Sequence, residues 1–343
     1  MLNMAMVITA TAILIIFLLF SPSSVAILLN KLQLPTPVTG PESLAFDRDG
    51  GGPYVSSSDG RIFKYIGPND GFKEYAYTSP NRNRTFCDGL ADFSTVQAIC
   101  GRPIGLGFNH RTGDLYVTDA YLGLVKIGPN GGGNVTLLPW EQANGTIYAN
   151  GLDVDPDTGI VYYTISSTNF QLKDFQTLIN SADNSGSFLR YDPKTNQTTV
   201  LLSNLALPAG VAVSKDGSFV LVSEYLANRI QRVWLKGPKA NSSEIFMLTA
   251  GRPDNIKRNS LGQFWISVNS FLGPPSSLRC TTLPSGVRVN KNGLVLQVVS
   301  LTDEYGGEPA SEVQEYNGKL YGGSLLANYA AVFTPLEFFT LSL

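Results

Sequence analysis

One pattern of apolar and polar positions recurs along the chain, each time with different residues. Each copy has a short strand of alternating apolar and polar residues, a tight turn that contains Gly, and a second strand rich in β-branched and aromatic residues. This order is typical of a β-hairpin. The copies begin at residues 42, 104, 150, 209, 254 and 311. Their spacing, alternately about 45 and about 60 residues, is typical of four-stranded propeller blades.

The six copies predict an all-β protein that forms one six-bladed β-propeller within residues 27–343. The longer intervals place insertions at residues 70–100, 166–188 and 271–286. A β-sandwich of irregular hairpins is the alternative, but a sandwich gives no reason for repeating one pattern. After Phe333, residues 334–343 lack the pattern of a last strand, and Pro335 argues against a central strand there.

The N-terminus has the features of a signal peptide. An apolar run from Ala5 to Phe20 is followed by small residues at Ser24 and Ala26, which predicts a signal peptide over residues 1–26 with cleavage after Ala26. A membrane anchor is the alternative, but it needs about 20 apolar residues, more than this run provides. We therefore expect entry into the secretory pathway, with the vacuole, the endoplasmic reticulum or the cell exterior as destination, and no membrane attachment after cleavage.

Sequons and cysteines agree with an oxidising compartment. Cys87 and Cys100 are 13 residues apart in a polar segment, which a disulfide between them could close into a loop. The alternative is that both are buried thiols. Cys280 is left without a partner. Sequons arise often by chance, so they count only because a signal sequence precedes them. The five predicted glycosylation sites are Asn83, Asn134, Asn144, Asn196 and Asn241.

Composition excludes two classes of protein. With 25 Lys and Arg against 27 Asp and Glu, the chain is too close to neutral for electrostatic binding to nucleic acid. Hydrophobic residues make up 43% of the chain, enough for a large core, so disorder is not its main state. The expected partner is a small-molecule substrate.

A ring of polar residues is expected around the propeller axis, because the first strand of each module lines the central channel. The residues that open these strands are Glu42, Ile104, Asn150, Ala209, Asp254 and Ser311. Three oxygen donors come from alternate modules, and Asn255 adds a fourth. Carboxylate and amide oxygens without Cys or His suit calcium. The alternative is that these side chains only bind backbone groups where loops enter strands.

The single histidine, His110, lies in a turn of the second module. A Ser-His-Asp triad would have to use it. Its position at a hairpin tip, away from the ring, favours a solvent-exposed turn residue instead.

Several short sequence segments together resemble those of a known family. They include DGRIFKY at 59–65, DPDTGIVY at 155–162, KGPK at 236–239 and NIKRN at 255–259. Over residues 35–333 the chain resembles the strictosidine synthase-like proteins of plants. The resemblance implies a six-bladed propeller and a disulfide between Cys87 and Cys100.

The resemblance also implies a chemistry and shows a departure from it. True strictosidine synthases condense tryptamine with secologanin, and a glutamate near the last blade handles the amine and imine protons. Ser311 stands at the position of that glutamate. A serine hydroxyl cannot act as a general base near neutral pH, so strictosidine synthesis would require Glu312 or Glu308 to reach the site.

The four oxygen-donor residues of the ring are similar to a pattern kept by calcium-dependent paraoxonases and gluconolactonases, which hydrolyse esters and lactones. Ala209 stands where those relatives have another ligand, and Ile104 where paraoxonases have a histidine. The leading hypothesis is a metal-assisted hydrolase of small esters or lactones with calcium as its cofactor. The alternatives are an amine-aldehyde condensing enzyme and a catalytically silent propeller that binds a ligand.

Overall fold

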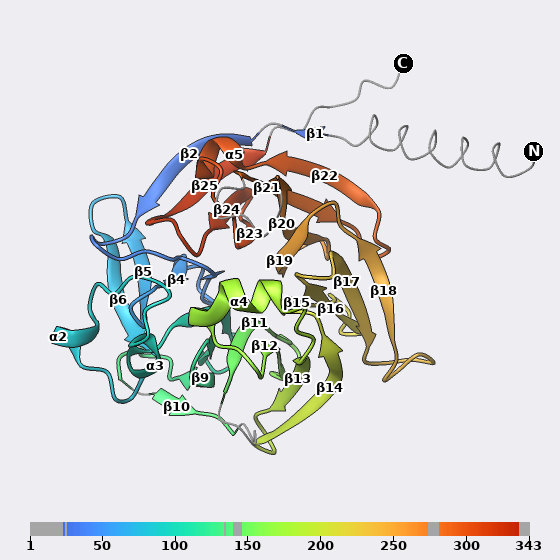
Figure 1. The fold of residues 1–343 in the computed structure, drawn as a ribbon, viewed down its shortest axis with the longest axis horizontal. Helices are drawn as coiled ribbons and strands as arrows, with labels where there is room; N and C mark the ends of the chain where they lie inside the picture. The colour runs from blue at the N-terminus through green and yellow to red at the C-terminus, as the bar shows by residue number, and fades with distance from the viewer. Residues whose placement is uncertain (1–22, 25, 134, 140–145, 274–280, 336–343) are drawn as a thin grey trace, which may run out of the picture.

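The fold is a ring of small sheets arranged around a central axis (Figure 1). The computed structural model describes residues 23–24, 26–133, 135–139, 146–273 and 281–335. These residues form six sheets, and in each the strand that comes first in its module lies innermost. The predicted six-bladed β-propeller is therefore confirmed.

The blades follow one another along the chain. The first consists of β3 (Leu44–Ala45), β4 (Tyr54–Ser56), β5 (Arg61–Gly67) and β6 (Gly71–Tyr77). The second consists of β7 (Pro103–Phe108), β8 (Leu115–Asp119), β9 (Gly123–Ile127) and β10 (Val135–Leu137). The third consists of β11 (Tyr148–Val154), β12 (Val161–Ser167), β13 (Gly186–Asp192) and β14 (Gln197–Leu205).

The remaining blades include two strands from the N-terminal end. The fourth consists of β15 (Pro208–Val213), β16 (Phe219–Glu224), β17 (Arg229–Trp234) and β18 (Ser243–Leu248). The fifth consists of β19 (Arg252–Arg258), β20 (Phe264–Leu272), β21 (Thr281–Val289) and β22 (Val295–Ser300), with β1 (Ser23–Ser24) parallel to β22. The sixth consists of β23 (Glu312–Tyr316), β24 (Lys319–Gly323), β25 (Tyr329–Pro335) and, outermost, β2 (Ala26–Gln33).

The core lies between neighbouring blades, because each sheet buries both faces. Ala212 of β15 and Ile256 of β19, for example, belong to one buried cluster shared by two blades. The inner strands also approach closely around the axis. A Cβ atom at Gly210 would lie 2.5 Å from the backbone nitrogen of Ile256, so this position requires glycine. Such packing fixes the spacing of the residues that open the inner strands.

The connections that interrupt the repeat differ partly from the expected insertions. The segment 70–100 begins with the regular strand β6, and only then come α2 (Arg84–Cys87) and α3 (Gln97–Cys100). The segment 166–188 carries η1 (Leu172–Asp174) and α4 (Phe175–Asn180), which lies near the centre of the ring (Figure 1). The segment 271–286 is mostly strand where it is described, and α5 (Thr302–Tyr305) precedes the last blade. These insertions thus include blade strands, which the repeat spacing could not separate from true insertions.

A disulfide joins the two short helices of the first insertion. The Sγ atoms of Cys87 and Cys100 are 2.04 Å apart, and both residues are fully buried. The structure therefore contains the pairing that the resemblance implied. Cys280 lies outside the described residues.

Replacing both Cys87 and Cys100 with Ser should lower the free energy of unfolding by about 3 kcal/mol, because the open chain gains conformational entropy. Urea unfolding followed by circular dichroism measures this loss. Reducing the unmodified protein with dithiothreitol is the matched control and should give a similar loss. An unfolding midpoint that neither treatment moves would contradict the prediction.

The last blade is closed by both ends of the described chain. β25 lies between β24 and β2, with Thr334 opposite Ile27 and Pro335 opposite Ala26. The expectation that the final strand pattern fails after Phe333 is therefore wrong for these two residues. Pro335 is compatible with the strand because it stands at its end. Residues 336–343 lie outside the described part of the chain.

The processing predictions are left open by the structure. Cleavage after Ala26 would remove β1 and leave β2 from Ile27 onward. Three of the sequon residues, Asn83, Asn196 and Asn241, are exposed, whereas Asn134 and Asn144 are outside the described residues. Signal cleavage, glycosylation and compartment stay predictions. No helix among the described residues is long and apolar enough to cross a membrane, and the run from Ala5 to Phe20 is not among them.

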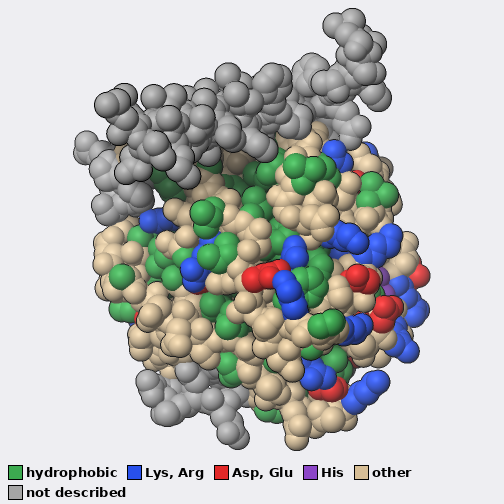
Figure 2. Space-filling model, turned by 90° about the vertical axis from the view of Figure 1, so that its right-hand side faces the viewer, with side chains coloured by type: hydrophobic (Ala, Val, Ile, Leu, Met, Phe, Trp, Pro, Cys, Tyr) green, Lys and Arg blue, Asp and Glu red, His purple; other side chains and the backbone are tan. Residues whose placement is uncertain are grey.

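The outer surface of the ring is mixed in character. Seen from the side, Lys and Arg side chains gather toward one face of the ring, at the right of Figure 2. Exposed apolar side chains such as Ile245 and Leu248 lie on the outermost strand of the fourth blade. Asp and Glu side chains lie among these Lys and Arg side chains in the same view.

Candidate functional site

Four of the six residues that open the inner strands line one pocket of about 400 Å³ at a mouth of the central channel. They are Glu42, Asn150, Asp254 and Ser311. We call this cavity the axial pocket. Ile104 and Ala209 complete the ring as buried apolar residues. The structure thus brings together side chains that are up to 269 positions apart, as the repeat register predicts.

Glu42 is a buried carboxylate at the base of the axial pocket, with 4% of its surface exposed. Burial, followed by the charges of Asp254 and Glu312, raises the pKa of Glu42 well above its usual range. Asn255 lies behind it and donates from Nδ2 to both carboxylate oxygens of Glu42 at 3.2 Å. Asn255 does not line the pocket itself, unlike the other three predicted ligands.

Asp254 faces the same pocket as a second acidic group. Burial and then the charge of Glu312 raise the pKa of Asp254 to about 8. A carboxyl group with this pKa exchanges a proton near neutral pH. Glu42 is buried and Asp254 is partly buried, and two neighbouring carboxylates with so little solvent are costly to ionise together. The bottom of the pocket therefore favours either protons or a cation.

Asn150 lines the same pocket and has an unpaired amide oxygen. Its Nδ2 donates to the Ser166 Oγ at 3.0 Å, and Ser166 in turn donates to the Pro208 carbonyl at 2.7 Å. Because the Ser166 hydroxyl gives its proton to Pro208, it must accept from Asn150, which fixes the orientation of the amide. The Oδ1 of Asn150 is buried and has no hydrogen-bond partner among the described residues. A buried acceptor left unpaired is unfavourable, and a cation would satisfy it.

Ser311, Glu308 and Glu312 are the candidates for acid-base catalysis, and the structure places their side chains in different surroundings. Ser311 lines the axial pocket, and its Oγ accepts from the Leu325 backbone nitrogen at 3.0 Å. Glu308 is exposed and is not among the residues that line the pocket. Glu312 follows Ser311 but points elsewhere, because successive side chains along an extended chain alternate in direction. Neither glutamate places a carboxylate where Ser311 stands.

Glu312 instead forms a buried ion pair inside the channel. Its carboxylate lies 3.2 Å from the Lys257 Nζ and accepts hydrogen bonds from the Ser43 Oγ and the Leu44 backbone nitrogen, both at 2.8 Å. Burial raises the pKa of Glu312, while Lys257 lowers it. The Lys257 Nζ also lies 3.3 Å from the Leu106 carbonyl oxygen, so the pair joins the inner strands of several blades.

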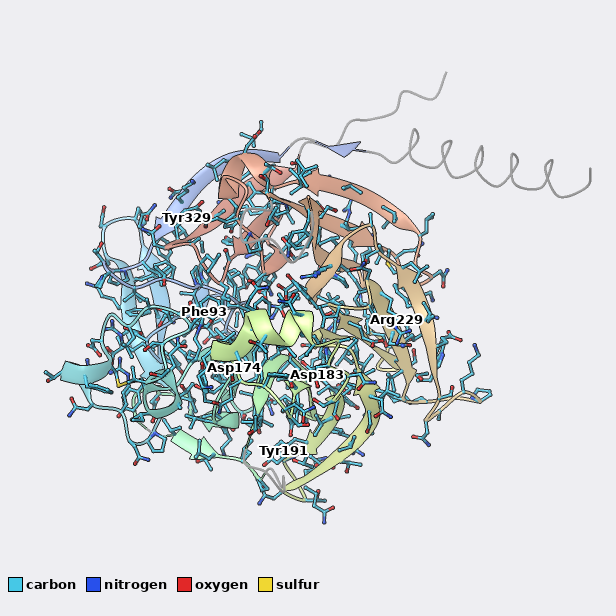
Figure 3. The ribbon with its side chains drawn as sticks, viewed as in Figure 1. Phe93, Asp174, Asp183, Tyr191, Arg229 and Tyr329 are labelled. Carbon is cyan, nitrogen blue, oxygen red and sulfur yellow. A yellow bond between two sulfur atoms is a disulfide. The ribbon has the colours of Figure 1, made fainter. Side chains whose placement is uncertain are left out.

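The walls of the axial pocket are mainly apolar, and part of them comes from the insertions. Phe93 follows α2, and Phe175 opens α4. Their ring centroids are 6.4 Å apart, and Tyr225 stands 6.3 Å from Phe175 on the other side. Figure 3 shows Phe93 near the centre of the ring, beside α4. The other lining residues are Tyr148, Lys173, Gln176, Leu207, Pro309, Leu325 and Leu326. The pocket therefore has acidic side chains at its bottom and mainly apolar side chains around its entrance.

The repeat pattern gave no signal for this aromatic wall, because the insertions do not alternate in the way that the blades do. It did place His110 away from the ring. His110 is exposed, and its Nε2 lies 3.2 Å from the Phe46 carbonyl oxygen at the other mouth of the channel.

The donor set fits a hard cation. Two carboxylates and the unpaired amide oxygen are the ligand types that calcium prefers. In the described part of the chain, no group of three or more His, Cys, Asp or Glu side chains could hold a metal ion.

Two family models match the chain. The one described as strictosidine synthase matches residues 150–238, and the one described as strictosidine synthase-like, N-terminal, matches residues 29–65. The first of these segments carries Asn150, and the second carries Glu42.

Solved structures with low sequence identity share the fold. A gluconolactonase from Xanthomonas campestris is 15% identical, with a TM-score of 0.60 over 91% of this chain and 90% of its own. The calcium-binding protein regucalcin from Agrobacterium tumefaciens is 12% identical, with a TM-score of 0.59 over 92% and 97%. At these identities the likeness shows the propeller alone.

Curated relatives are much closer in sequence. The Arabidopsis thaliana protein strictosidine synthase-like 12 is 43% identical over 306 residues, which cover 88% of this chain and 89% of that protein. Strictosidine synthase from Catharanthus roseus is 38% identical over 300 residues, which cover 87% and 84%. The chain belongs to the strictosidine synthase-like family.

Proposed function

We propose that the axial pocket hydrolyses small apolar esters or lactones with the help of a calcium ion held by Glu42, Asn150 and Asp254. The observation that carries the proposal is the unpaired Oδ1 of Asn150, a residue that lines the same pocket as two carboxyl groups of raised pKa. When bound, calcium would polarise the substrate carbonyl and stabilise the negative charge that develops on its oxygen.

The protein's own residues have separate tasks in this proposal. Glu42 and Asp254 supply negative charge, and Asn150 supplies a neutral oxygen whose direction Ser166 fixes. Asn255 now donates to Glu42, so its amide would have to rotate to become a ligand itself. Phe93 and Phe175 accommodate the apolar part of the substrate.

The comparisons support this proposal only by analogy. One neighbour in fold is described as a gluconolactonase and another as a calcium-binding protein. The propeller hosts more than one chemistry, so the argument rests on the donor set in this chain.

The test is a screen of lactones and aryl esters with purified protein before and after chelation. We expect turnover of apolar substrates that is lost with chelator and restored by calcium. Magnesium should restore it poorly, because it requires stricter octahedral geometry than two carboxylates and an amide provide. Turnover that survives complete removal of calcium would contradict the metal-assisted mechanism.

One observation favours a second candidate function, the condensation of an amine with an aldehyde. Asp254, with its pKa of about 8, is an acid-base group poised near neutral pH within an aromatic pocket. Without a cation, it could exchange the protons of an amine and an imine. Chelation distinguishes the two candidates, because a condensation that uses Asp254 requires the calcium-free pocket.

Strictosidine itself should not form from tryptamine and secologanin, because Ser311 provides no carboxylate and neither Glu308 nor Glu312 replaces it. Product analysis by liquid chromatography and mass spectrometry, against a protein-free control, measures this. Product above the uncatalysed rate would contradict the prediction. Comparing Glu312→Gln with Asp254→Asn would then identify the carboxyl group responsible.

A further inference from the structure

A second pocket lies at the other mouth of the channel, where the inner strands end. Its volume is about 410 Å³, within the range of small-molecule sites. We call it the opposite pocket. Lys257 lines it and pairs with Glu312, whose charge acts on the carboxylates of the axial pocket. The buried ion pair therefore stands between the two pockets.

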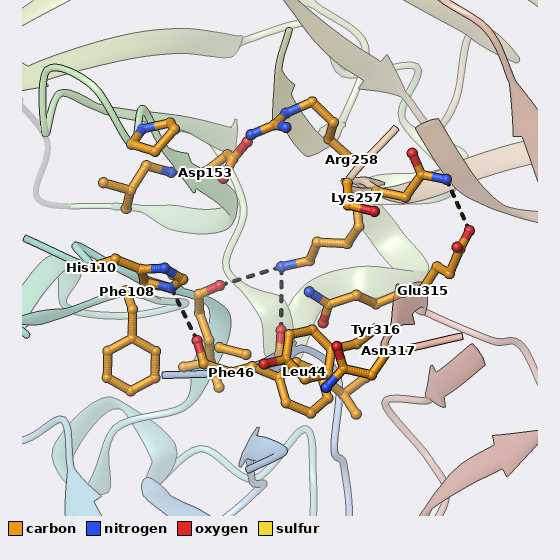
Figure 4. A pocket seen from close by; sticks show the side chains of 18 of the residues that line it. Leu44, Phe46, Phe108, His110, Asp153, Lys257, Arg258, Glu315, Tyr316 and Asn317 are labelled. Atoms are coloured by element: carbon orange, nitrogen blue, oxygen red, sulfur yellow. Dashed lines mark hydrogen bonds between the residues drawn. The ribbon is translucent and has the colours of Figure 1, made fainter. Parts of the chain in front are cut away.

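One wall of the opposite pocket is aromatic. The rings of Phe46 and Tyr316 stack in parallel with centroids 3.8 Å apart, and Phe108 and His110 continue the wall (Figure 4). Tyr316 is only half-buried, so part of its ring remains accessible. The face of an aromatic ring carries partial negative charge and receives polarised C–H groups well.

The polar groups around this wall include both donors and acceptors, and several are held in place. The Glu315 Oε2 accepts from the Asn259 Nδ2 at 2.9 Å and from the Trp265 Nε1 at 2.8 Å. The Arg258 Nε donates to the Val213 carbonyl at 2.8 Å.

Gln314 lines the opposite pocket and has an unpaired hydrogen-bond acceptor. Its Oε1 is buried and has no hydrogen-bond partner among the residues that the structure describes. Its side chain lines the opposite pocket and is half-buried as a whole. Rotation about χ3 of Gln is soft, so the amide can turn toward a ligand in the cavity. A ligand that donates to this oxygen would remove the penalty of an unpaired acceptor.

The charges that line the opposite pocket are balanced. Lys257 and Arg258 stand against Asp153 and Glu315, and Lys257 is already paired with Glu312. An anion or a cation would therefore meet groups of its own sign as well as the opposite one. A neutral ligand whose groups both donate and accept avoids this repulsion, and hydroxyl groups have this property.

We propose that the opposite pocket binds a neutral, polyhydroxylated small molecule of monosaccharide size. Its C–H face would lie against Tyr316, and its hydroxyl groups would bond to Gln314, Glu315 and Arg258. This inference goes beyond the proposed hydrolase activity, because it concerns a different cavity and involves no reaction.

The experiment is isothermal titration calorimetry, supported by saturation-transfer NMR, with the methyl glycosides of glucose, galactose, mannose and xylose. We expect at least one to bind saturably with one site per chain. Tyr316→Ala and Gln314→Leu should each raise its dissociation constant by about tenfold or more. Tyr225→Ala, which removes an aromatic ring from the axial pocket, is the matched control and should leave the constant unchanged.

Several results would overturn the proposal. One is that no glycoside binds saturably, and another is that gluconate binds while every neutral glycoside fails. Binding that neither Tyr316→Ala nor Gln314→Leu weakens would also place the sugar elsewhere. If Tyr316→Ala does not fold, as judged by its melting curve, Gln314→Leu decides alone. Asp254→Ala should abolish hydrolysis without affecting glycoside binding, so this inference and the proposed function can fail separately.

Discussion

Replacing Asp254 with Ala should abolish calcium binding in the axial pocket and lower ester or lactone turnover by about 100-fold or more. The variant keeps Glu42 and Asn150 but loses one of the two negative charges that we assign to the ion. Steady-state kinetics with the best substrate from the screen measures the effect. Asp49→Ala, at a carboxylate whose side chain is 85% exposed, is the matched control and should turn over substrate normally.

Stability measurements show whether Asp254→Ala loses activity because a calcium-binding side chain is missing or because the fold is destabilised. The pKa of Asp254 is raised to about 8, so the folded calcium-free protein holds a proton that the unfolded chain releases near pH 4. Its stability should therefore fall as the pH rises from about 4 to about 8. Asp254→Ala should lack this part of the pH dependence and be at least as stable without calcium at pH 8. A variant that is less stable than the calcium-free protein at pH 8 would contradict this account of Asp254.

Replacing Lys257 with Met should lower the free energy of unfolding by about 3–5 kcal/mol, because it leaves the fully buried Glu312 carboxylate without its cation. The loss should be greatest at high pH, where Glu312 must ionise, and smaller in acid, where it can take up a proton. Urea unfolding at several pH values measures both the size and the trend.

Two further variants sharpen the test of the ion pair. Lys257→Met combined with Glu312→Gln removes the buried charge and should recover much of the stability. Lys239→Met, which breaks the exposed pair with Glu244, should change stability by less than about 1 kcal/mol. If Lys257→Met costs no more than Lys239→Met, the channel pair does not hold the blades together as the structure indicates.

Much of the fold of this chain could be predicted from patterns that are local in the sequence. A hairpin is specified by alternation and by turn residues close in sequence, so six copies could be recognised without any long-range information. The first copy begins at residue 42 and β3 at Leu44, while the last begins at residue 311 and β23 at Glu312. Register then placed Glu42, Asn150 and Asp254 around one axis, because equivalent positions of a propeller meet there.

The parts that sequence could not supply depend on contacts between distant segments. Phe93 and Phe175 reach the axial pocket from insertions that have no repeat to compare them with. Lys257 meets Glu312 because β19 and β23 lie side by side, 55 positions apart in the chain. The direction of the Glu312 side chain, by contrast, could have been predicted from the sequence. Successive side chains along an extended chain point to opposite sides, so Glu312 points away from the side of Ser311. That rule could have excluded Glu312 as a replacement for the missing glutamate.

Calorimetric titration of calcium into chelator-treated protein at pH 7 tests the central claim most directly. We predict one ion per chain, bound with release of protons, because Asp254 with its pKa of about 8 must give up its proton to become a ligand. Titrations in buffers of different ionisation enthalpy count these protons, and Asp254→Asn should neither bind the ion nor release them. Absence of saturable calcium binding, or binding that Asp254→Asn leaves intact, would contradict the account.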